Sequence, residues 1–320
     1  MKKLWIIAAN TFTETLRQPI YAVIIISGLI LLTISPSLTM YTLDEDIKLL
    51  RELGLSTLFL SGLFIAIFSA AGAITEEIET KTITTVLSKP VSRTVFVVGK
   101  FLGVVTAVGL AHYILTLAML MAIRHGVLSE AADTHDWTVI TAAAVVVGTS
   151  FLITAFLNYS YDWNFTATGI GLLAGLSTLA IVFLIFIDRD WKYNPGNNKF
   201  TAFDIHASIL LLLAVVVLVA LAVLFSTRCN VVLTLTFCVG IFLLGLISDW
   251  IFGRFADTYM WAKIGYMLVP NLQVFWASDA IYGSGAIPFR YLLQSGMYTL
   301  LYTAGILSFS VALFQRRQVG

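Results

Sequence analysis

The chain has 320 residues, of which 59% are hydrophobic and only 12% are charged, and its mean hydropathy is +0.92. A soluble domain carries about a quarter charged residues, so this composition excludes a soluble globular protein and predicts a polytopic α-helical membrane protein. The net charge of +1 provides no basic surface for phosphate contacts, and we therefore expect no nucleic-acid partner.

Residues 1–18 are predicted to form an amphipathic helix that lies in the membrane interface. Its apolar face comprises Leu4, Ile7, Ala8, Phe12 and Leu16, and its polar face comprises Asn10, Glu14, Arg17 and Gln18. Trp5 suits the depth of the lipid headgroups. Arg17 and Pro19 are expected to close this helix directly before the first membrane span.

Eight apolar segments follow, each long enough to cross a hydrocarbon core about 30 Å thick. They cover about residues 20–43, 55–75, 94–123, 138–158, 166–187, 205–225, 230–248 and 289–313, and their interiors contain no Asp or Glu. The predicted fold is therefore all-α, with residues 1–320 forming a single transmembrane domain.

The second and third spans are separated by a polar stretch, residues 76–93, that carries a short helix signal. Glu77 and Lys81 stand four residues apart with the acid first, the favourable order for a helical pair. The apolar stripe of the same helix consists of Ile83, Val86 and Leu87. Pro90 ends the helix because its ring disfavours helical geometry in the preceding residue. We expect a short amphipathic helix at the membrane surface, which also fits an ordinary interfacial loop.

The order of residues in this stretch resembles a known family. The residues that carry the likeness are Glu77, Thr82, Ile83, Leu87, Lys89, Pro90, Val91, Ser92 and Arg93, followed by Gly99 and Lys100. They resemble the first cytoplasmic loop of type 2 ATP-binding-cassette (ABC) exporter permeases, most closely the small permeases like that of the nitrous-oxide-reductase maturation transporter. In that family the loop carries a coupling helix that docks on a partner ATPase.

The resemblance implies functional roles for residues in two places, the polar stretch 76–93 and the end of the N-terminal helix. The implied ATPase-coupling residues are Glu77, Thr82, Ile83, Val86, Leu87, Pro90 and Arg93. We expect the apolar members to bury against the ATPase, with Glu77 and Arg93 on the polar rim. The run from Glu14 to Pro19, which includes Arg17, is similar to the elbow helix with which these permeases begin.

The predicted span count departs from the six spans usual in that family. Residues 138–187 are interpreted as an extra hairpin, and the alternative is that one of its two segments is partial or re-entrant. Residues 249–288 are a long, aromatic-rich segment. Within it, the apolar run of residues 266–282 is interrupted at Pro270 and Asn271 and is too short and too broken to span the membrane. In the family such a segment caps the path on the outer side, so Pro270, Asn271 and Phe275 are outer-gate candidates; the other interpretation is a loop resting on the membrane.

Few other polar residues fall within the predicted spans. His112 lies near the middle of the third span, where an ionisable residue is a functional candidate, although a neutral histidine bonded across helices is the commoner case. His125 and His135 lie near Asp133 and Asp136, but their spacing fits no metal template, and we expect no metal and no cofactor. Gly99 and Gly103, and also Gly171 and Gly175, have the spacing that lets helices approach closely.

The chain lacks the G-x-x-x-x-G-K-[ST] motif, so we expect no ATPase activity of its own. Our first hypothesis is the transmembrane permease of an ABC exporter in the cell inner membrane, with both termini cytoplasmic. Its partners would be two ABC ATPase subunits, a second permease copy or a similar permease, and membrane lipid. The second hypothesis is an ATP-independent secondary transporter or a membrane scaffold subunit. The absence of acids in the predicted spans disfavours ion-coupled transport.

Overall fold

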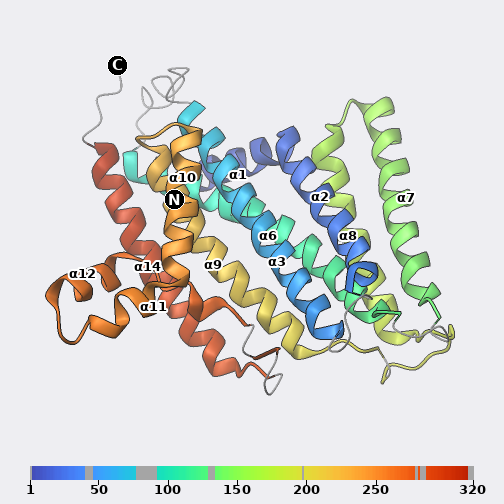
Figure 1. The fold of residues 1–320 in the computed structure, drawn as a ribbon. Coiled ribbons are helices and arrows are strands. Elements are labelled where there is room, and N and C mark those ends of the chain that lie inside the picture. The colour runs from blue at the N-terminus through green and yellow to red at the C-terminus, as the bar shows by residue number, and fades with distance from the viewer. Residues whose placement is uncertain are drawn as a thin grey trace.

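The structure is a computed structural model, and it describes residues 2–39, 46–76, 92–128, 134–196, 198–277, 280–281 and 286–315. Within these ranges the secondary structure is helical, apart from one isolated β-bridge between Ile187 and Tyr193 (Figure 1). The helices are α1 (Lys2–Arg17), α2 (Pro19–Thr39), α3 (Asp46–Ala70), η1 (Ala71–Glu76), α6 (Arg93–His125), α7 (Trp137–Tyr161), α8 (Phe165–Phe186), α9 (Ala202–Ser226), α10 (Val231–Leu246), α11 (Ser248–Ile251), η2 (Gly253–Phe255), α12 (Met260–Leu268), η3 (Gln273–Phe275) and α14 (Phe289–Gln315).

Seven of these helices are long and apolar enough to cross a membrane, which confirms the predicted all-α polytopic fold. The seven are α2, α3 extended by η1, α6, α7, α8, α9 and α14. The remaining predicted span, the seventh at about residues 230–248, belongs to a bent pair in which α10 meets the α11–η2 segment at 63°. Because α10 has 16 residues, it rises only about 24 Å, less than a hydrocarbon core needs.

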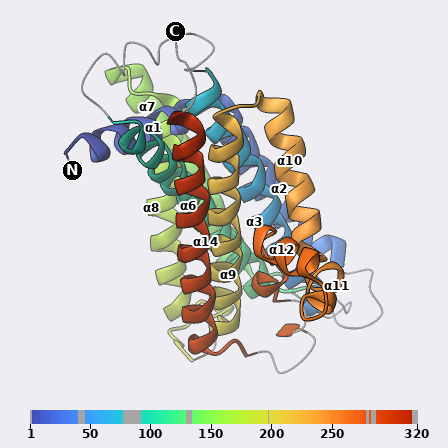
Figure 2. The ribbon, with the colours of Figure 1, turned by 90° about the vertical axis from the view of Figure 1, so that its left-hand side faces the viewer.

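The long helices run side by side, and α1 lies across one end of the bundle (Figure 2). We call this the α1 end. It also carries the C-terminal end of α3 with η1, the start of α6, the α7–α8 and α9–α10 turns, and the C-terminal end of α14 (Figure 1). The opposite end carries the junctions that lead into α3, α7, α9 and α14 (Figure 1).

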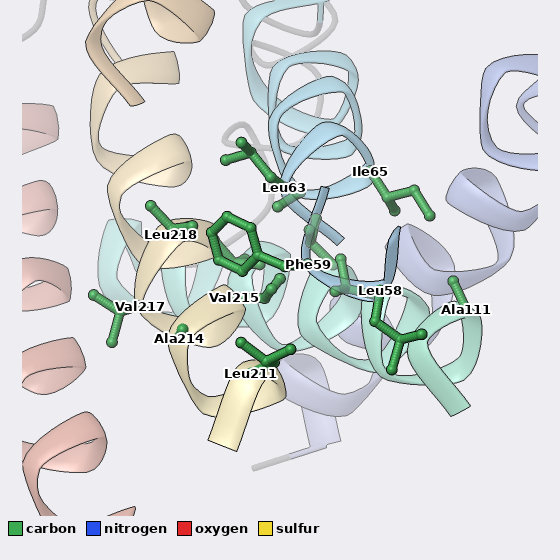
Figure 3. Packing of buried hydrophobic residues seen from close by; sticks show 14 of the residues in the cluster. Leu58, Phe59, Leu63, Ile65, Ala111, Leu211, Ala214, Val215, Val217 and Leu218 are labelled. Carbon is green, nitrogen blue, oxygen red and sulfur yellow. The ribbon is translucent and has the colours of Figure 1, made fainter. Parts of the chain in front are cut away.

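The core sits where α3, α6 and α9 meet. Figure 3 shows side chains of α3 and α9 lying against one another there, including Phe59, Val215 and Leu218, with Ala111 of α6 nearby. Of the 18-residue apolar stretch in each helix, 72% is buried in α3 and in α9, compared with 22% in α7 and in α8. The α7–α8 hairpin therefore lies at the edge of the bundle (Figure 1).

Aromatic side chains mark the two membrane surfaces on this hairpin. Trp137 and Tyr193 are exposed at the opposite end, and Tyr159 and Trp163 are exposed at the α1 end. Tryptophan and tyrosine gather at the headgroup level of membranes because their rings have both apolar and polar parts. These two levels of aromatic residues fit helices that are long and apolar enough to cross a membrane.

Two helices begin earlier than the sequence predicted. The predicted connector before the second span is already the start of α3, which begins at Asp46, and the sixth span begins at Ala202 as α9. Glu52 and Asp204, which the sequence placed before the second and sixth spans, therefore lie within helices. The reason is that both residues occupy the first two turns, where the helix leaves the hydrocarbon core and tolerates charge.

Candidate functional site

The candidate site is the α1 end, where the two boundaries of residues 77–91 meet α1, α14 and the α9–α10 turn. Six of the predicted coupling residues lie outside the described residues: Glu77, Thr82, Ile83, Val86, Leu87 and Pro90. The structure does describe the residues directly before and after them. The site is therefore built from what holds those two boundaries in place.

The boundary before residue 77 is a π-helical turn, η1, that continues α3. Single π-helical turns inside α-helices are rare and occur frequently at functional sites. In η1 the Thr75 hydroxyl lies 3.3 Å from the Ser226 carbonyl oxygen and 3.4 Å from that of Cys229. Thr75 and Ile74 are both buried. The end of α3 is thus bonded to the α9–α10 turn.

The boundary after residue 91 is the start of α6, and it is fixed in a similar way. The Ser92 hydroxyl accepts a hydrogen bond from the Val95 N–H at 3.3 Å and so caps the helix. Arg93 donates from Nη1 to the carbonyl oxygens of Phe314 at 2.8 Å and Gln315 at 2.5 Å. These are carbonyls of the last turn of α14, which have no partner within their own helix. The start of α6 is therefore attached to the end of α14.

Further contacts strengthen this attachment. The Arg93 guanidinium lies 5.6 Å from the centre of the Phe314 ring, and that ring stacks on Phe96 with centroids 5.6 Å apart. From the α9–α10 turn, Arg228 donates to the Leu313 carbonyl at 2.6 Å. Two guanidinium groups thus face the C-terminal end of α14, where the helix dipole favours positive charge. We had predicted Arg93 on the rim of an ATPase-facing surface; its described contacts lie within the chain.

The helix α1 packs against α6 just beyond this boundary. A Cβ atom at Gly103 would lie 2.6 Å from the Ala8 carbonyl oxygen and 2.6 Å from the Thr11 Cβ. A Cβ at Gly99 would meet Ile7 at 2.8 Å. Both glycines therefore permit close packing, as their spacing predicted. Gly171 and Gly175 have no neighbour within 4 Å of such an atom among the described residues, so that part of the prediction finds no contact here.

A buried lysine joins α6 to α1. Lys100 of α6 is buried, and its Nζ lies 3.7 Å from Glu14 of α1 and 5.8 Å from the centre of the Phe96 ring. The face of α1 that the sequence predicted to be apolar is the one turned towards the bundle. Arg17 is the exposed last residue of α1, and Pro19 is the first residue of α2, a position that proline suits.

His112 lies between α6 and α9 in the interior of the bundle. Its Nε2 is 2.9 Å from the Ser208 carbonyl oxygen and 3.0 Å from the Ser208 hydroxyl, which also bonds to Thr116 at 2.6 Å. His112 is buried. This is the arrangement of a histidine bonded across helices, the commoner of the two cases weighed for it. A second such bond, from the Tyr21 hydroxyl to the Ala107 carbonyl at 2.7 Å, joins α2 to α6 and was not predicted.

The predicted outer-gate residues lie in the segment that connects α10 to α14. Pro270 is packed against α10, because its carbonyl oxygen would lie 2.7 Å from a Cβ at Gly245. The Asn271 N–H donates to the Tyr298 hydroxyl of α14 at 2.9 Å. Phe275 is fully buried, with its ring centre 5.9 Å from that of Tyr298. All three residues are thus packed onto the bundle in this conformation.

Buried ion pairs at the opposite end were missed from the sequence. Arg124, which we had assigned to a polar loop, is in the last turn of α6 and is 2% exposed; its Nε lies 3.5 Å from an oxygen of Asp136, which is 1% exposed. Arg189 approaches the same carboxylate at 3.7 Å. Arg51 of α3 bonds to Asp204 of α9 at 2.8 Å. The charges themselves were visible in the sequence, but their pairing depends on helices that meet only in the fold.

His125 and His135 are neighbours, with 3.4 Å between Nε2 of the first and Nδ1 of the second. Asp136 is engaged by the two arginines, and Asp133 lies outside the described residues. Among the residues that the structure describes, no group of three His, Cys, Asp or Glu side chains could hold a metal ion.

Comparison with known protein families places part of this chain. A family model described as ABC-2 family transporter protein matches residues 5–161, from α1 to the last residue of α7. No curated protein matches the chain. The matched range contains α1, both boundaries of residues 77–91 and the whole of α6, which are the elements that form the candidate site.

Proposed function

We propose that this chain, whose residues 5–161 match the ABC-2 family transporter model, is the permease of an ABC exporter, driven by ATP hydrolysis on a separate subunit. Two ATPase subunits would dock on the loop formed by residues 76–93, one on each copy in a pair of permeases. The pair would be a homodimer or a heterodimer with a similar permease. The protein would lie in the cell inner membrane with the α1 end in the cytoplasm.

One observation carries this proposal: both boundaries of residues 77–91 are bonded to the same group of helix ends. Thr75 before the loop bonds to the α9–α10 turn, and Arg93 after it bonds to the end of α14. Arg228 of the α9–α10 turn bonds to α14 as well. A force on the loop would therefore act on α3, α6, α9 and α14 together. This suits rigid-body coupling between subunits.

Two further observations support an ATP-driven permease over ion-coupled transport. Among the described residues, each Asp or Glu that lies within a candidate span is in its first turns, as with Glu52 and Asp204, and ion-coupled transport would call for acids near the middle. His112, Ser208 and Thr116, in the interior of the bundle, are bonded to one another. The α7–α8 hairpin is proposed as an addition to a six-span core, although the family match includes α7.

The proposal is tested by Leu87→Asp in the predicted apolar stripe of the loop. The permease should remain folded and inserted, but co-purification of an ABC ATPase encoded beside it should fall at least tenfold. Truncating an apolar anchor at an interface costs on the order of 2 kcal/mol, and introducing a charge there costs more. The matched control is Leu128→Asp at the opposite end, which should leave ATPase binding unchanged. Full ATPase binding and ATP hydrolysis with Leu87→Asp would reject the coupling role.

A further inference from the structure

The helix α14 makes specific polar contacts near both of its ends. It has 27 residues and is therefore about 40 Å long. At the α1 end its last carbonyls accept hydrogen bonds from Arg93 and Arg228. Phe314, in the same turn, is fully buried against Phe96. This end of α14 is thus held by the residue that directly follows the proposed coupling loop.

Towards the opposite end, three tyrosines of α14 hold the segment between α10 and α14. The Tyr302 hydroxyl donates to the Leu268 carbonyl at 2.6 Å, at the end of α12. The Tyr298 hydroxyl accepts from the Asn271 N–H at 2.9 Å, and the Tyr291 hydroxyl donates to the Val274 carbonyl at 2.6 Å.

The three tyrosines share one face of α14, because they stand four and seven residues apart. Each of them bonds to the main chain of the segment, so the contact holds its backbone and not only its side chains. The rings of Tyr298 and Tyr302 also pack together with centroids 5.7 Å apart, and Phe275 packs on Tyr298. Residues 260–277 would therefore follow a movement of α14.

The buried face of α14 makes few polar bonds to its neighbours. It carries the small hydroxyl side chains of Ser295, Thr299, Thr303 and Ser310, together with Leu292, Ile306 and Phe314. Thr299 bonds within its own helix, to the Ser295 carbonyl, and the hydroxyls of Ser295, Thr303 and Ser310 have no hydrogen-bond partner in the described structure. Small side chains without bonds across an interface present little resistance to the small shear motions that packed helices make. The polar bonds of α14 to other segments are made by its last turn and by the three tyrosines, of which Tyr302 lies at the middle of the helix.

We infer that α14 transmits movement between the start of α6 and the segment 260–277 on the other side of the membrane, with Arg93 and the three tyrosines as positioning residues. The inference rests on the proposed function for the source of the movement. The mechanical link itself is a property of this chain. Thermodynamic coupling is reciprocal, so a change at either end of α14 must be felt at the other end.

The test is hydrogen–deuterium exchange of the full chain in lipid nanodiscs. Arg93→Gln removes the bonds to Phe314 and Gln315, and it should speed exchange in residues 260–277 about fivefold or more, the lower range of typical coupling between sites. The double variant Tyr298→Phe with Tyr302→Phe keeps both rings but removes their hydroxyls. It should speed exchange by a similar factor in residues 92–96 and 311–315, at the α1 end.

The control is Tyr113→Phe, which removes a hydroxyl that bonds to Thr178 between α6 and α8 at 2.7 Å and does not touch α14. It should leave exchange unchanged at both ends of α14. Changes confined to the neighbourhood of each substitution would overturn the inference, as would an equal effect of Tyr113→Phe. If Arg93→Gln does not fold, the tyrosine double variant decides by itself.

This readout needs no ATPase and no substrate. If Leu87→Asp leaves ATPase binding unchanged while the exchange experiment shows coupling through α14, the proposed function is rejected and this inference stands. If Leu87→Asp abolishes ATPase binding while the exchange experiment shows no coupling, the proposed function stands and this inference is rejected.

Discussion

The α3–α6–α9 core and the α7–α8 hairpin are built from similarly apolar helices, but they are held in different ways. In α3 and α9 most of the apolar window is buried, and the contacts are between aliphatic and aromatic side chains such as Phe59, Val215 and Leu218. The hairpin buries little of its surface and is fixed at the opposite end by Arg124 and Asp136.

The difference follows from the solvent of a membrane protein. Lipid tails are as apolar as leucine, so an apolar helix gains nothing from leaving lipid except through close packing or polar bonds. The core helices obtain their stability from packing over their whole length. The hairpin at the edge has a small apolar cluster with α6, made by Met121, Val139, Val146, Ala180 and Leu184, and polar contacts near its end. Three measurements test whether the core and the hairpin are stabilised in these different ways.

The largest effect is expected for Arg124→Gln, which should lower the free energy of unfolding by about 3–5 kcal/mol, because it leaves the Asp136 carboxylate buried with a weaker partner. It also removes donors to the carbonyls of Leu184 and Ile187 at the end of α8. Thermal unfolding in detergent micelles would measure the loss.

The matched control is Arg189→Gln. The Arg189 side chain is 37% exposed and lies 3.7 Å from the same carboxylate, so this change should lower the free energy of unfolding by less than about 1 kcal/mol. Equal effects of the two variants would show that the buried pair is not what fixes the hairpin.

A smaller effect is expected when a leucine of the core is truncated. Leu218→Ala removes a fully buried side chain from α9 and should cost about 2–4 kcal/mol through the cavity that it leaves. The same change at Leu152 of α7, which is 69% exposed, should change stability by less than about 0.5 kcal/mol. Both values come from the same unfolding assay. A large loss at Leu152 would mean that this face of α7 packs against another chain in the assay.

The smallest effect is a pH dependence of the hairpin, through Asp188 directly after α8. The Asp188 carboxylate accepts hydrogen bonds from the backbone N–H groups of Lys192 at 3.1 Å and Asp190 at 3.0 Å, and these bonds lower its pKa. A lowered pKa in the folded state means that the stabilisation is present above the pKa of the unfolded chain, about 3.9, and is lost as pH falls through the folded value.

The measurement is the thermal midpoint between about pH 3 and pH 6, for the natural chain and for Asp188→Asn. The natural chain should lose stability below about pH 4, and the variant should show a shallower decline there because it has no proton to take up at this position. Parallel curves for the two proteins would show that this carboxylate contributes nothing to the pH dependence.

From the sequence alone one can predict that the chain is helical, which residues most of its long helices cover and which side of α1 faces the protein. A segment in lipid must satisfy its backbone hydrogen bonds internally, so an apolar run of sufficient length has only the helix available to it. That is why the predicted ends of α6, α7, α8 and α14 agree with the structure within about three residues. The faces of α1 could be assigned because a helix at the interface has one polar side and one apolar side.

The tertiary structure decided which helices form the core, which charges pair and where α10 bends. Spans that are apolar on every side carry no signal that distinguishes a lipid-facing side from a protein-facing side, so the burial of α3 and α9 and the exposure of α7 could not be predicted. The resemblance placed Arg93 on the rim of an ATPase-facing surface, but the sequence could not show that Arg93 also bonds to carbonyl oxygens 221 and 222 residues away along the chain. Arg51 and Asp204 are separated by 153 residues in the same way. A pairing of this kind is set by the packing of whole helices, and that packing depends on close fits such as those of Gly99 and Gly103 against α1.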